Sequence, residues 1–429
     1  MSLVAEFRAE RQLARFAARQ SDALQSEYGF LVGRFIDPAT LARASAIARR
    51  WGVHPHEVTI ANGWLDAEDY YRALAERCAA PFKDRLLAAD VAPPATAGPR
   101  QSLAKGLLKE RARAGSFVFA PDRLRPNALS EMLARLSPYG FSLASPHAVR
   151  AAICHHFGPS LALHAIEGLA SRHPGMSART RPALWQRLAV VAAALAVIAA
   201  IALAPVEAIW AITLALAGLF VPLIALRLVA AYRLLAAAKD DAPAATSRVP
   251  DHELPIYTLL VPLYREAHML PGLITALTRL DYPAAKLDIK LVLEAADRAT
   301  IAAAHALRLP GNIEIVVVPE LHPRTKPKAL NYALPLARGE YVVIYDAEDR
   351  PEPGQLRQAL DAFRNGHANL AAVQARLNVY NAGETWLTRQ FTIEYCALFD
   401  GMLPRSTGSA CPSRSAAPPI ISAPRRWSG

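Results

Sequence analysis

Cysteine is scarce in this chain, and its placement excludes two common structural roles. The four cysteines lie far apart, at Cys78, Cys154, Cys396 and Cys411, and no two of them have the Cys-x-x-Cys spacing. Such a distribution implies neither a disulfide framework nor a structural zinc site. The first sixteen residues are charged and contain no apolar core, so we expect no signal peptide.

The chain also lacks the glycine-rich loops that bind nucleotides in two large fold families. Neither G-x-G-x-x-G nor G-x-x-x-x-G-K-[ST] occurs, which disfavours a Rossmann dinucleotide site and a P-loop. Lysine is rare too, since forty of the 48 basic residues are arginine, and the formal net charge is +11. No nucleic-acid-binding motif accompanies this charge, so we expect no nucleic-acid partner. A membrane surface would use part of the charge.

Residues 1–180 predict a mostly helical domain. The segment 37–53 begins with an Asp cap and repeats apolar residues at helical spacing, and the segment 65–82 does the same. Segments 125–136 and 145–158 form a second set of this kind. The pattern fits either one small helical domain or two related halves.

Two uncharged apolar runs follow, over residues 188–204 and 208–226. Each is about long enough to cross a bilayer, for which roughly 17–25 residues are needed. A buried hairpin in a soluble protein is the alternative, and two consecutive uncharged runs disfavour it. Arginines flank the pair on both sides, whereas the connection carries only Glu207, so the positive-inside rule places both flanks in the cytoplasm. We therefore expect a transmembrane hairpin over 188–226.

Beyond a linker at 239–255, strands alternate with helices. The predicted strands are 256–263, 287–295, 313–319, 340–346 and 370–380, and a helical pattern follows each of them. Such alternation predicts a mainly parallel sheet that is covered on both faces. Ligands of such sheets bind at the carboxyl ends of the strands, where we expect the functional residues.

An acidic cluster follows the fourth of these strands. Asp346, Glu348 and Asp349 place three carboxylates within four residues. Carboxylates this close repel one another unless a cation neutralises them, and hard oxygen ligands suit Mg²⁺ or Mn²⁺. A solvated acidic turn before Pro351 is the alternative interpretation.

Cations gather at a predicted helix start just before the same strand. They are Arg324, Lys326 and Lys328. Helix N-termini and cationic side chains both favour phosphate groups. A carboxylate cluster and a cationic helix start on one sheet edge predict a site for a diphosphate and a divalent metal.

As a set, these segments resemble the family 2 glycosyltransferases, the membrane-linked kind that includes cellulose and hyaluronan synthases. The resemblance covers about residues 254–404 and includes "VPLYRE", "LEAADRAT", "TKPKALN" and "DAED". It implies an incomplete α/β fold of the GT-A kind, Rossmann-like with a mainly parallel sheet, over residues 256–404. It also implies inverting transfer of a sugar from a nucleotide-sugar, in the first place a UDP-sugar, to a polysaccharide or lipid acceptor. The enzyme would be a multi-pass protein of the bacterial inner membrane that makes an exopolysaccharide or glycolipid, with both soluble domains cytoplasmic.

The resemblance assigns nucleotide-binding roles to particular residues. Pro262, Tyr264 and Glu266 match the end of the family's first strand, which meets the nucleotide. Glu294 and Asp297 match an acidic segment that contacts uridine. Many relatives have two consecutive aspartates there, and this chain has only the second.

The same resemblance implies a phosphate contact and a metal site. Lys328 and Asn331 match the segment that touches the diphosphate. Asp346, with either Glu348 or Asp349, matches the D-x-D motif that holds Mg²⁺ or Mn²⁺. The family's general base lies in a later acidic motif followed by Gln-x-x-Arg-Trp; neither occurs in this chain, so the catalytic base is not assigned.

The N-terminal segment has a resemblance of its own. Residues 28–90 resemble the N-terminal domain of type II secretion ATPases, which also precedes some bacterial glycosyltransferases. Certain members of that group bind a cyclic dinucleotide, which is thus a candidate partner. No intact signature for that ligand occurs here, so the expected role is docking or regulation.

The last residues, 405–429, differ from everything before them. Serine, proline and arginine dominate, and no hydrophobic period survives. The family usually continues with Leu-Pro-x-Pro-Leu-Gly-Gly-Thr-Ser-x-His-Phe. With GC-rich codons for residues 411–422, a shift of one base reads Leu-Pro-Ile-Pro-Leu-Gly-Gly-Thr-Ser-His-His-Phe. Our hypothesis is an out-of-frame tail; an ordinary disordered terminus is the alternative.

Three functional hypotheses follow. The first is a family 2 glycosyltransferase that is truncated and inactive as written, because it lacks the general base, much of the acceptor site and the closing membrane helices. The second is a non-enzymatic, membrane-anchored nucleotide-binding or regulatory protein. The third, a transport or secretion component, rests only on the N-terminal resemblance.

The tail hypothesis predicts the result of resequencing the gene across codons 395–429 from genomic DNA. We expect one additional base near codon 405 and a reading frame that continues into an acidic motif and Gln-x-x-Arg-Trp. An unchanged sequence would contradict the hypothesis.

Overall fold

The structure is a computed structural model, and it falls into two compact units. It describes residues 26–93, 98–113, 115–136, 140–177, 179, 182–237, 249–367, 370–375, 379, 381–402 and 420–422. The first unit comprises Met1–Ile166, Ser247–Val373 and Pro419–Gly429, and the second comprises Glu167–Thr246 and Gln374–Pro418. The predicted linker 239–255 and the predicted tail 405–429 fall largely outside the described residues.

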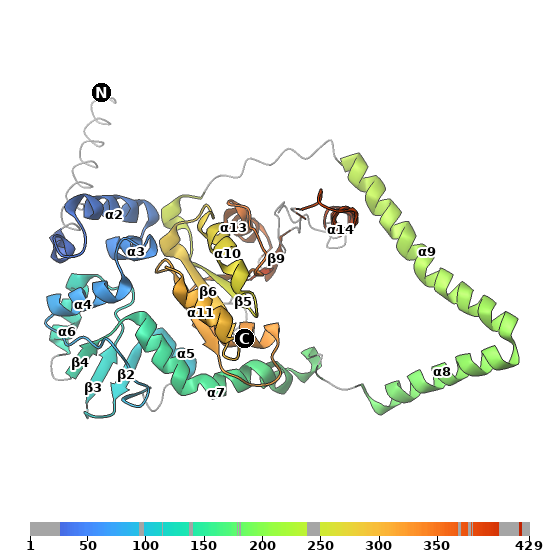
Figure 1. Cartoon of the computed structure of the whole chain (residues 1–429), viewed down its shortest axis with the longest axis horizontal. Helices are drawn as coiled ribbons and strands as arrows, with labels where there is room; N and C mark the ends of the chain where they lie inside the picture. The colour runs from blue at the N-terminus through green and yellow to red at the C-terminus, as the bar shows by residue number, and fades with distance from the viewer. Residues whose placement is uncertain are drawn as a thin grey trace, which may run out of the picture. The chain divides into compact units, whose positions relative to one another are not determined.

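Short capped helices form the first part of the first unit. They are η1 (Gly29–Leu31), α2 (Pro38–Trp51), α3 (Pro55–Ala61) and α4 (Ala67–Arg77), drawn in blue in Figure 1. The Asp37 carboxylate accepts a hydrogen bond from the Thr40 N–H, and Asp66 caps α4 in the same way. Gly52, with φ of 67°, ends α2. The helices predicted over 37–53 and 65–82 are confirmed.

A small sheet that the sequence analysis missed follows these helices. Its strands are β1 (Val91–Ala92), β2 (Leu107–Glu110), β3 (Ser116–Phe119) and β4 (Gly140–Leu143), in that order across the sheet. The pairs β1–β2 and β2–β3 are antiparallel, and β3–β4 is parallel. Strands of two to four residues are too short to show a period-two pattern. The helices α5 (Pro99–Lys105) and α6 (Pro126–Arg135) accompany it, so this region is helical but not all helical.

The main sheet of the first unit has six strands. They are β5 (Tyr257–Leu263), β6 (Leu287–Glu294), β7 (Ile313–Val318), β8 (Tyr341–Ile344), β9 (Ala372–Gln374) and β10 (Ile420–Ser422). Their spatial order is β7-β6-β5-β8-β10-β9. The pairs β5–β6, β5–β8 and β6–β7 are parallel, and β10 runs antiparallel to β8. The predicted mainly parallel sheet is confirmed.

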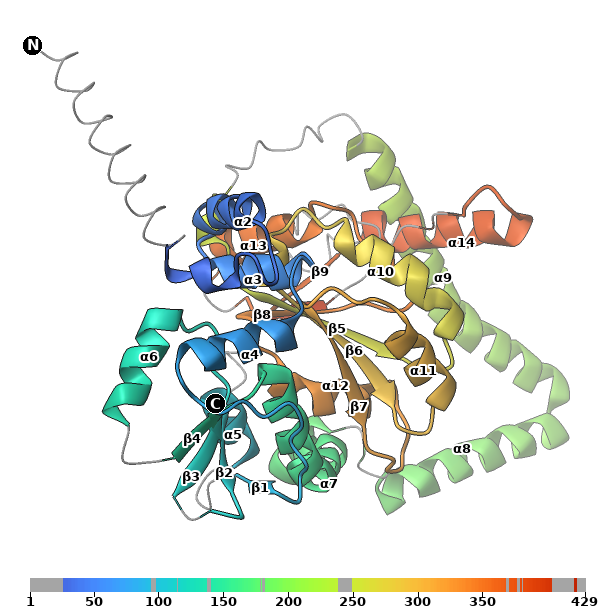
Figure 2. The same cartoon turned by 60° about the vertical axis from the view of Figure 1, so that its left-hand side comes forward.

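Helices cover both faces of this sheet, as Figure 2 shows. On one face lie α10 (Leu270–Thr278), α11 (Arg298–Ala306) and α13 (Gln355–Asn365). They share a hydrophobic core with the sheet residues Leu259, Val261 and Leu291. On the other face lie α12 (Lys326–Ala333) and α7 (Pro146–Arg172). Because both faces are covered, every residue of β6 is buried, and this includes its charged residues Asp288, Lys290 and Glu294.

The helix α7 belongs to the N-terminal part of the chain and yet completes the core of the main sheet. Leu161, Ala162 and Ala165 pack with Leu260 and Val292 of the sheet. Earlier in the same helix, Val149 and Ile153 pack against the small sheet. The N-terminal part and the main sheet are thus joined through one continuous helix.

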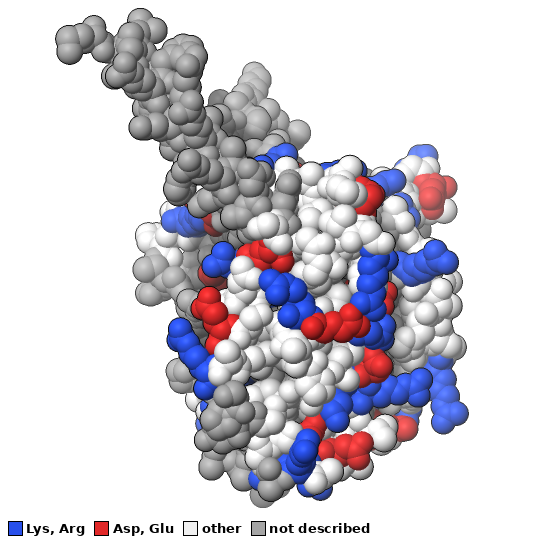
Figure 3. All heavy atoms as spheres, turned by 90° about the vertical axis from the view of Figure 1, so that its left-hand side faces the viewer, with Lys and Arg blue, Asp and Glu red and all other residues white. Residues whose placement is uncertain are grey.

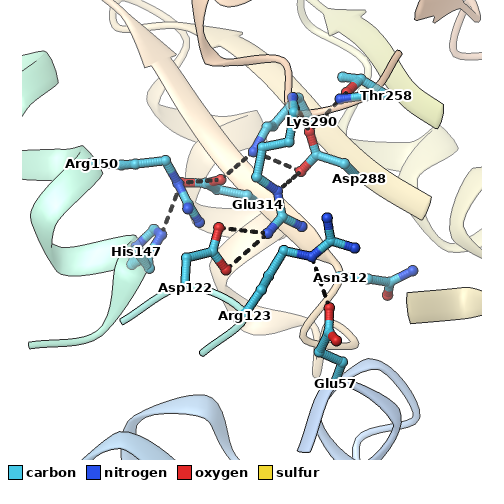
Figure 4. Close-up of polar contacts among 12 residues, drawn as sticks. Glu57, Asp122, Arg123, His147, Arg150, Thr258, Asp288, Lys290, Asn312 and Glu314 are labelled. Carbon is cyan, nitrogen blue, oxygen red and sulfur yellow. Dashed lines mark hydrogen bonds and ion pairs between the residues drawn. The ribbon is translucent and has the colours of Figure 1, made fainter. Parts of the chain in front are cut away.

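A buried lysine lies where the N-terminal part meets the amino ends of the main strands. The Lys290 side chain is 0% exposed, and its Nζ lies 2.9 Å from Asp288 Oδ1. The same ammonium also contacts Glu314 Oε2 on the neighbouring strand (Figure 4). Burial raises the pKa of Asp288, but the charges of Lys290 and Arg338 outweigh burial and bring that pKa to about 2. The charges of Lys290 and Arg150 likewise hold the pKa of Glu314 well below its usual value, so both carboxylates are charged at neutral pH.

Residues of the N-terminal part extend this cluster. Arg150 of α7 donates from Nε to both oxygens of Glu314 at 3.1 Å, and His147 lies 3.2 Å from the same carboxylate. Arg338 bonds Asp288 at 3.1 Å and lies 3.4 Å from Asp122 of the N-terminal part. Three carboxylates thus face three basic side chains, which is the condition for burying charge without a large penalty.

The second unit contains the apolar helices. It holds α8 (Leu184–Leu203), α9 (Pro205–Ala237), α14 (Trp386–Cys396) and the π-helix η7 (Ala397–Met402). The spans Leu184–Leu203 and Pro205–Val229 are long and apolar enough to cross a membrane, and none of their most apolar windows is buried. A core helix of a soluble protein would be mostly buried. Within this unit, Arg227 of α9 lies 3.6 Å from Glu394 of α14.

Charged side chains of both signs are mixed on one face of the molecule. On the face drawn in Figure 3, Lys and Arg side chains lie beside Asp and Glu side chains, and no broad area carries one sign alone. Exposed pairs such as Arg72–Asp84, at 2.7 Å, belong to this pattern. On this face, the net charge of +11 does not form one patch.

Replacing Lys290 by Met should destabilise the first unit at neutral pH by about 3–5 kcal/mol, because two buried carboxylates lose their shared cation. The pKa of Asp288 is about 2 in the folded protein and 3.8 unfolded, so the stability it contributes is present above pH 3.8 and is lost as the pH falls through 2. The difference between variant and wild type should therefore shrink below pH 4. Urea denaturation at several pH values measures both effects.

Lys109→Met is the matched control, since Lys109 is an exposed lysine on β2. It should change the denaturation midpoint little at any pH. A Lys290→Met protein that is as stable as wild type at pH 7 would show that the cluster does not hold the unit together.

Candidate functional site

A cavity opens at the carboxyl ends of β5, β6 and β8. Its volume is about 390 Å³. It is lined by Pro262, Leu263, Tyr264, Glu266, Val292, Glu294, Arg324, Thr325, Lys326, Ala329, Asp346, Ala347 and Glu348. Below we call it the sheet-end cavity. Six of the ten site residues expected from the sequence line it, and Asp297, Lys328, Asn331 and Asp349 do not.

The end of β5 presents Tyr264 and Glu266 to the cavity through a constrained turn. Arg265 between them has a φ of 60°, in the left-handed region that favours glycine. The carboxylate of Asp297 holds this turn, because its Oδ2 accepts a hydrogen bond from the Arg265 N–H. Its Oδ1 accepts from the Thr300 N–H at 3.2 Å and so caps α11. Both oxygens of Asp297 are thus used within the protein.

Negative charge accumulates around Glu266. Burial raises the pKa of the Glu266 carboxyl, and the neighbouring charges of Glu348 and Asp346 raise it further. These three carboxylates line one cavity. The cavity therefore favours a ligand or ion that brings positive charge to this side.

Glu294 is the last residue of β6, and its two carboxylate oxygens have different surroundings. Its Oε2 accepts a hydrogen bond from Lys328 Nζ at 2.8 Å, and Lys328 also donates to the Leu321 carbonyl at 2.9 Å. Lys328 is only 2% exposed, so its ammonium is held inside the protein and does not reach the cavity. Glu294 Oε1 is buried and has no hydrogen-bond partner among the described residues. It can accept a hydrogen bond from a donor group of a ligand.

Two cations line the cavity, Arg324 and Lys326, and Lys326 is the first residue of α12. Its Nζ contacts Asp346 Oδ1, and both side chains are about half exposed. The sequence predicts that Arg324, Lys326 and Lys328 lie near a phosphate, and the family resemblance assigns the phosphate contact to Lys328. The structure places Lys326, not Lys328, in the cavity lining.

The acidic cluster divides into cavity residues and a turn residue. Asp346 and Glu348 line the cavity, while Asp349 Oδ2 accepts a hydrogen bond from the Asp346 N–H at 2.7 Å. Burial raises the pKa of Asp349 to about 6, and the charges of Asp346 and Glu348 add to this effect. Asp349 therefore stabilises the turn that orients the other two.

The cavity carboxylates fit a divalent metal that a substrate would complete. Among the described residues, no group of three Asp, Glu, His or Cys side chains could hold an ion alone. Mg²⁺ and Mn²⁺ sites with nucleotides commonly use one or two carboxylates plus phosphate oxygens. Asp346 and Glu348 are two such carboxylates in one cavity lining, and their role as a D-x-D metal site stays a prediction.

Asn331 turns away from the cavity. Its Nδ2 donates to the Ala165 carbonyl of α7 at 3.1 Å. The side chain thus fastens α12 to α7, and these two helices lie on the same face of the sheet. A contact between Asn331 and a diphosphate stays a prediction, to which this geometry adds no support.

Comparison with known proteins shows which family this region resembles. Residues 255–413 match the family model described as "Glycosyltransferase like family 2". A Bacillus subtilis protein described as "Probable glycosyltransferase YdaM" is 28% identical over 144 residues, which cover 33% of this chain and 34% of that protein. Residues 255–413 are thus similar to the family 2 glycosyltransferases, and the resemblance seen in the sequence is confirmed.

Similar solved structures are also glycosyltransferases. A mannosyltransferase from Pyrobaculum calidifontis, solved with GDP-Man and Mn²⁺, is 29% identical, with a TM-score of 0.29; the match covers 37% of this chain and 45% of that one. The S. aureus protein TarS, solved with UDP-GlcNAc, is 20% identical, with a TM-score of 0.26, over 30% of this chain and 36% of that one. The chain spans about a third of the curated relative that it matches, 34%.

Replacing Asp297 by Ala should lower the free energy of unfolding by about 1–2 kcal/mol, because α11 loses its cap and the Arg265 turn loses its anchor. Urea denaturation measures the effect.

Arg265→Gly in the Asp297→Ala background is the companion variant. Glycine adopts the positive φ at no steric cost, so part of the lost stability should return. If Asp297→Ala unfolds at the wild-type midpoint, Asp297 does not hold the turn.

Proposed function

We propose that this chain acts as a glycosyltransferase that takes a sugar from a nucleotide-sugar, in the first place a UDP-sugar. The observation that carries the proposal is the sheet-end cavity, in which Glu294, Lys326 and the pair Asp346 and Glu348 converge. These groups offer an acceptor for a base, a cation for phosphate and two metal ligands. The acceptor of the sugar would be a polysaccharide, such as an exopolysaccharide, or a lipid.

Each residue has a defined task in this proposal. The free Oε1 of Glu294 accepts an N–H from the edge of the base, while Lys328 holds its other oxygen. Lys326 and the start of α12 bind the diphosphate. Asp346 and Glu348 would hold Mg²⁺ or Mn²⁺, which when bound offsets the charge of the leaving diphosphate. No residue is assigned as the general base.

The membrane location is part of the proposal. Two apolar helices, α8 and α9, have the length and composition of membrane spans, and arginines flank them. We propose that they form a hairpin in the bacterial inner membrane, with the N-terminal domain (1–180) and the glycosyltransferase domain (256–404) both in the cytoplasm. A cyclic dinucleotide at the N-terminal domain, and the out-of-frame origin of residues 405–429, stay predictions.

A second candidate is a membrane-anchored protein that binds the nucleotide without transferring the sugar. It shares the cavity and differs in chemistry. Release of UDP from a panel of UDP-sugars, with and without candidate acceptors, distinguishes the two, because a binding protein releases none.

The site assignment is tested by titrating the detergent-solubilised chain with UDP in Mn²⁺. Asp346→Asn should weaken UDP binding about tenfold or more, because a charged metal ligand is lost. Wild-type binding should fall similarly when EDTA removes the metal.

Glu131→Gln, which makes the same acid-to-amide change on the exposed surface of α6, is the control and should bind UDP as wild type does. UDP binding that is unaffected by both EDTA and Asp346→Asn would contradict the site.

A further inference from the structure

Lys326 pairs with one of the two carboxylates that we propose as metal ligands. Its Nζ contacts Asp346 Oδ1 within the sheet-end cavity. The other cation of the lining, Arg324, pairs instead with Glu320 on its own loop. Lys326 is therefore the lining cation that contacts Asp346.

The position of Lys326 in its helix makes this contact exchangeable. Lys326 is the first residue of α12, after the cap Thr325. A cation at a helix N-terminus lies against the positive end of the helix dipole, which disfavours it. Asp346 compensates for that cost, and the pair is about half exposed, so water and ions have access to it.

Lys328 cannot serve in the same way. Its ammonium is buried between Glu294 and the Leu321 carbonyl, at 2.8 and 2.9 Å. Leaving that place would strand a buried carboxylate, at a high cost. Of the two lysines of α12, Lys326 is the one that can move.

We propose that Lys326 is an internal counter-cation that neutralises Asp346 in the empty cavity and is transferred to the diphosphate when the metal and nucleotide bind. This inference rests on the proposed function. A divalent ion at Asp346 repels the Lys326 ammonium, and the incoming phosphate oxygens attract it. The lysine thus opposes binding of the metal alone and supports binding of the metal with the nucleotide.

The charge balance of the cavity supports this exchange. Glu266, Asp346 and Glu348 line the cavity together, and burial and the neighbouring charges raise the pKa of Glu266. A cavity with this excess of carboxylates needs a cation before substrate arrives. Lys326 provides it without requiring free metal.

Two binding measurements on Lys326→Gln test the proposal, because they should change in opposite directions. Mn²⁺ alone should bind the variant about two- to fivefold tighter than wild type, because the half-exposed Lys326 ammonium no longer competes with the metal for Asp346. The EPR signal of free Mn²⁺ measures this binding. UDP in saturating Mn²⁺ should bind about tenfold weaker, since a charged phosphate contact is lost. A variant that merely damaged the fold would not bind the metal more tightly.

Two further variants complete the design. Lys326→Arg keeps the charge and should leave Mn²⁺ binding near the wild-type value. Lys109→Gln removes a lysine from the exposed surface of β2 and should change neither measurement.

The outcomes separate this inference from the proposed function. If wild type binds UDP with Mn²⁺ but Lys326→Gln binds Mn²⁺ alone no better than wild type, the counter-cation role is wrong and the site assignment stands. If neither protein binds Mn²⁺ or UDP, both the inference and the proposed function fail.

Discussion

Lys290 has no contact with water, and two carboxylates on neighbouring strands share its charge. The organisation of the first unit depends on this arrangement. An unpaired charge there would be far more costly than any surface ion pair, so Asp288, Glu314 and the arginines around them must stay together. Arg150 and Asp122 come from the N-terminal part, and the cluster therefore binds that part to the sheet by charge as well as by apolar packing.

The same strands carry charge clusters with different tasks at their two ends. At the amino ends the acids and bases are matched and buried. At the carboxyl ends the sheet-end cavity holds more carboxylates than cations, and Glu294 keeps one oxygen without a partner among the described residues. A balanced cluster stabilises the fold, whereas an unbalanced one is suited to receiving a charged ligand.

The alternation of strands and helices was predictable from the sequence because the main strands are short segments rich in apolar residues, each followed by a helical pattern. The small sheet was not, since strands of two to four residues carry no visible period. The choice between Lys326 and Lys328 was also beyond the sequence. Residues two apart on a helix point about 200° apart, so only one of them faces the cavity, and packing decides which. Asp297 and Asn331 are residue types that often bind ligands, but Asp297 caps α11 and Asn331 bonds to α7.

The packing of α7 on the main sheet has a consequence for synthesis. A ribosome completes α7 before it makes either apolar helix and before it makes any strand of the main sheet, because α7 precedes them all in the chain. N-terminal segments of large proteins generally fold first. The face of α7 that carries Leu161 and Ala165 therefore stays without its sheet partners while the two long apolar helices are synthesised. The later strands then assemble on a helix that has already formed.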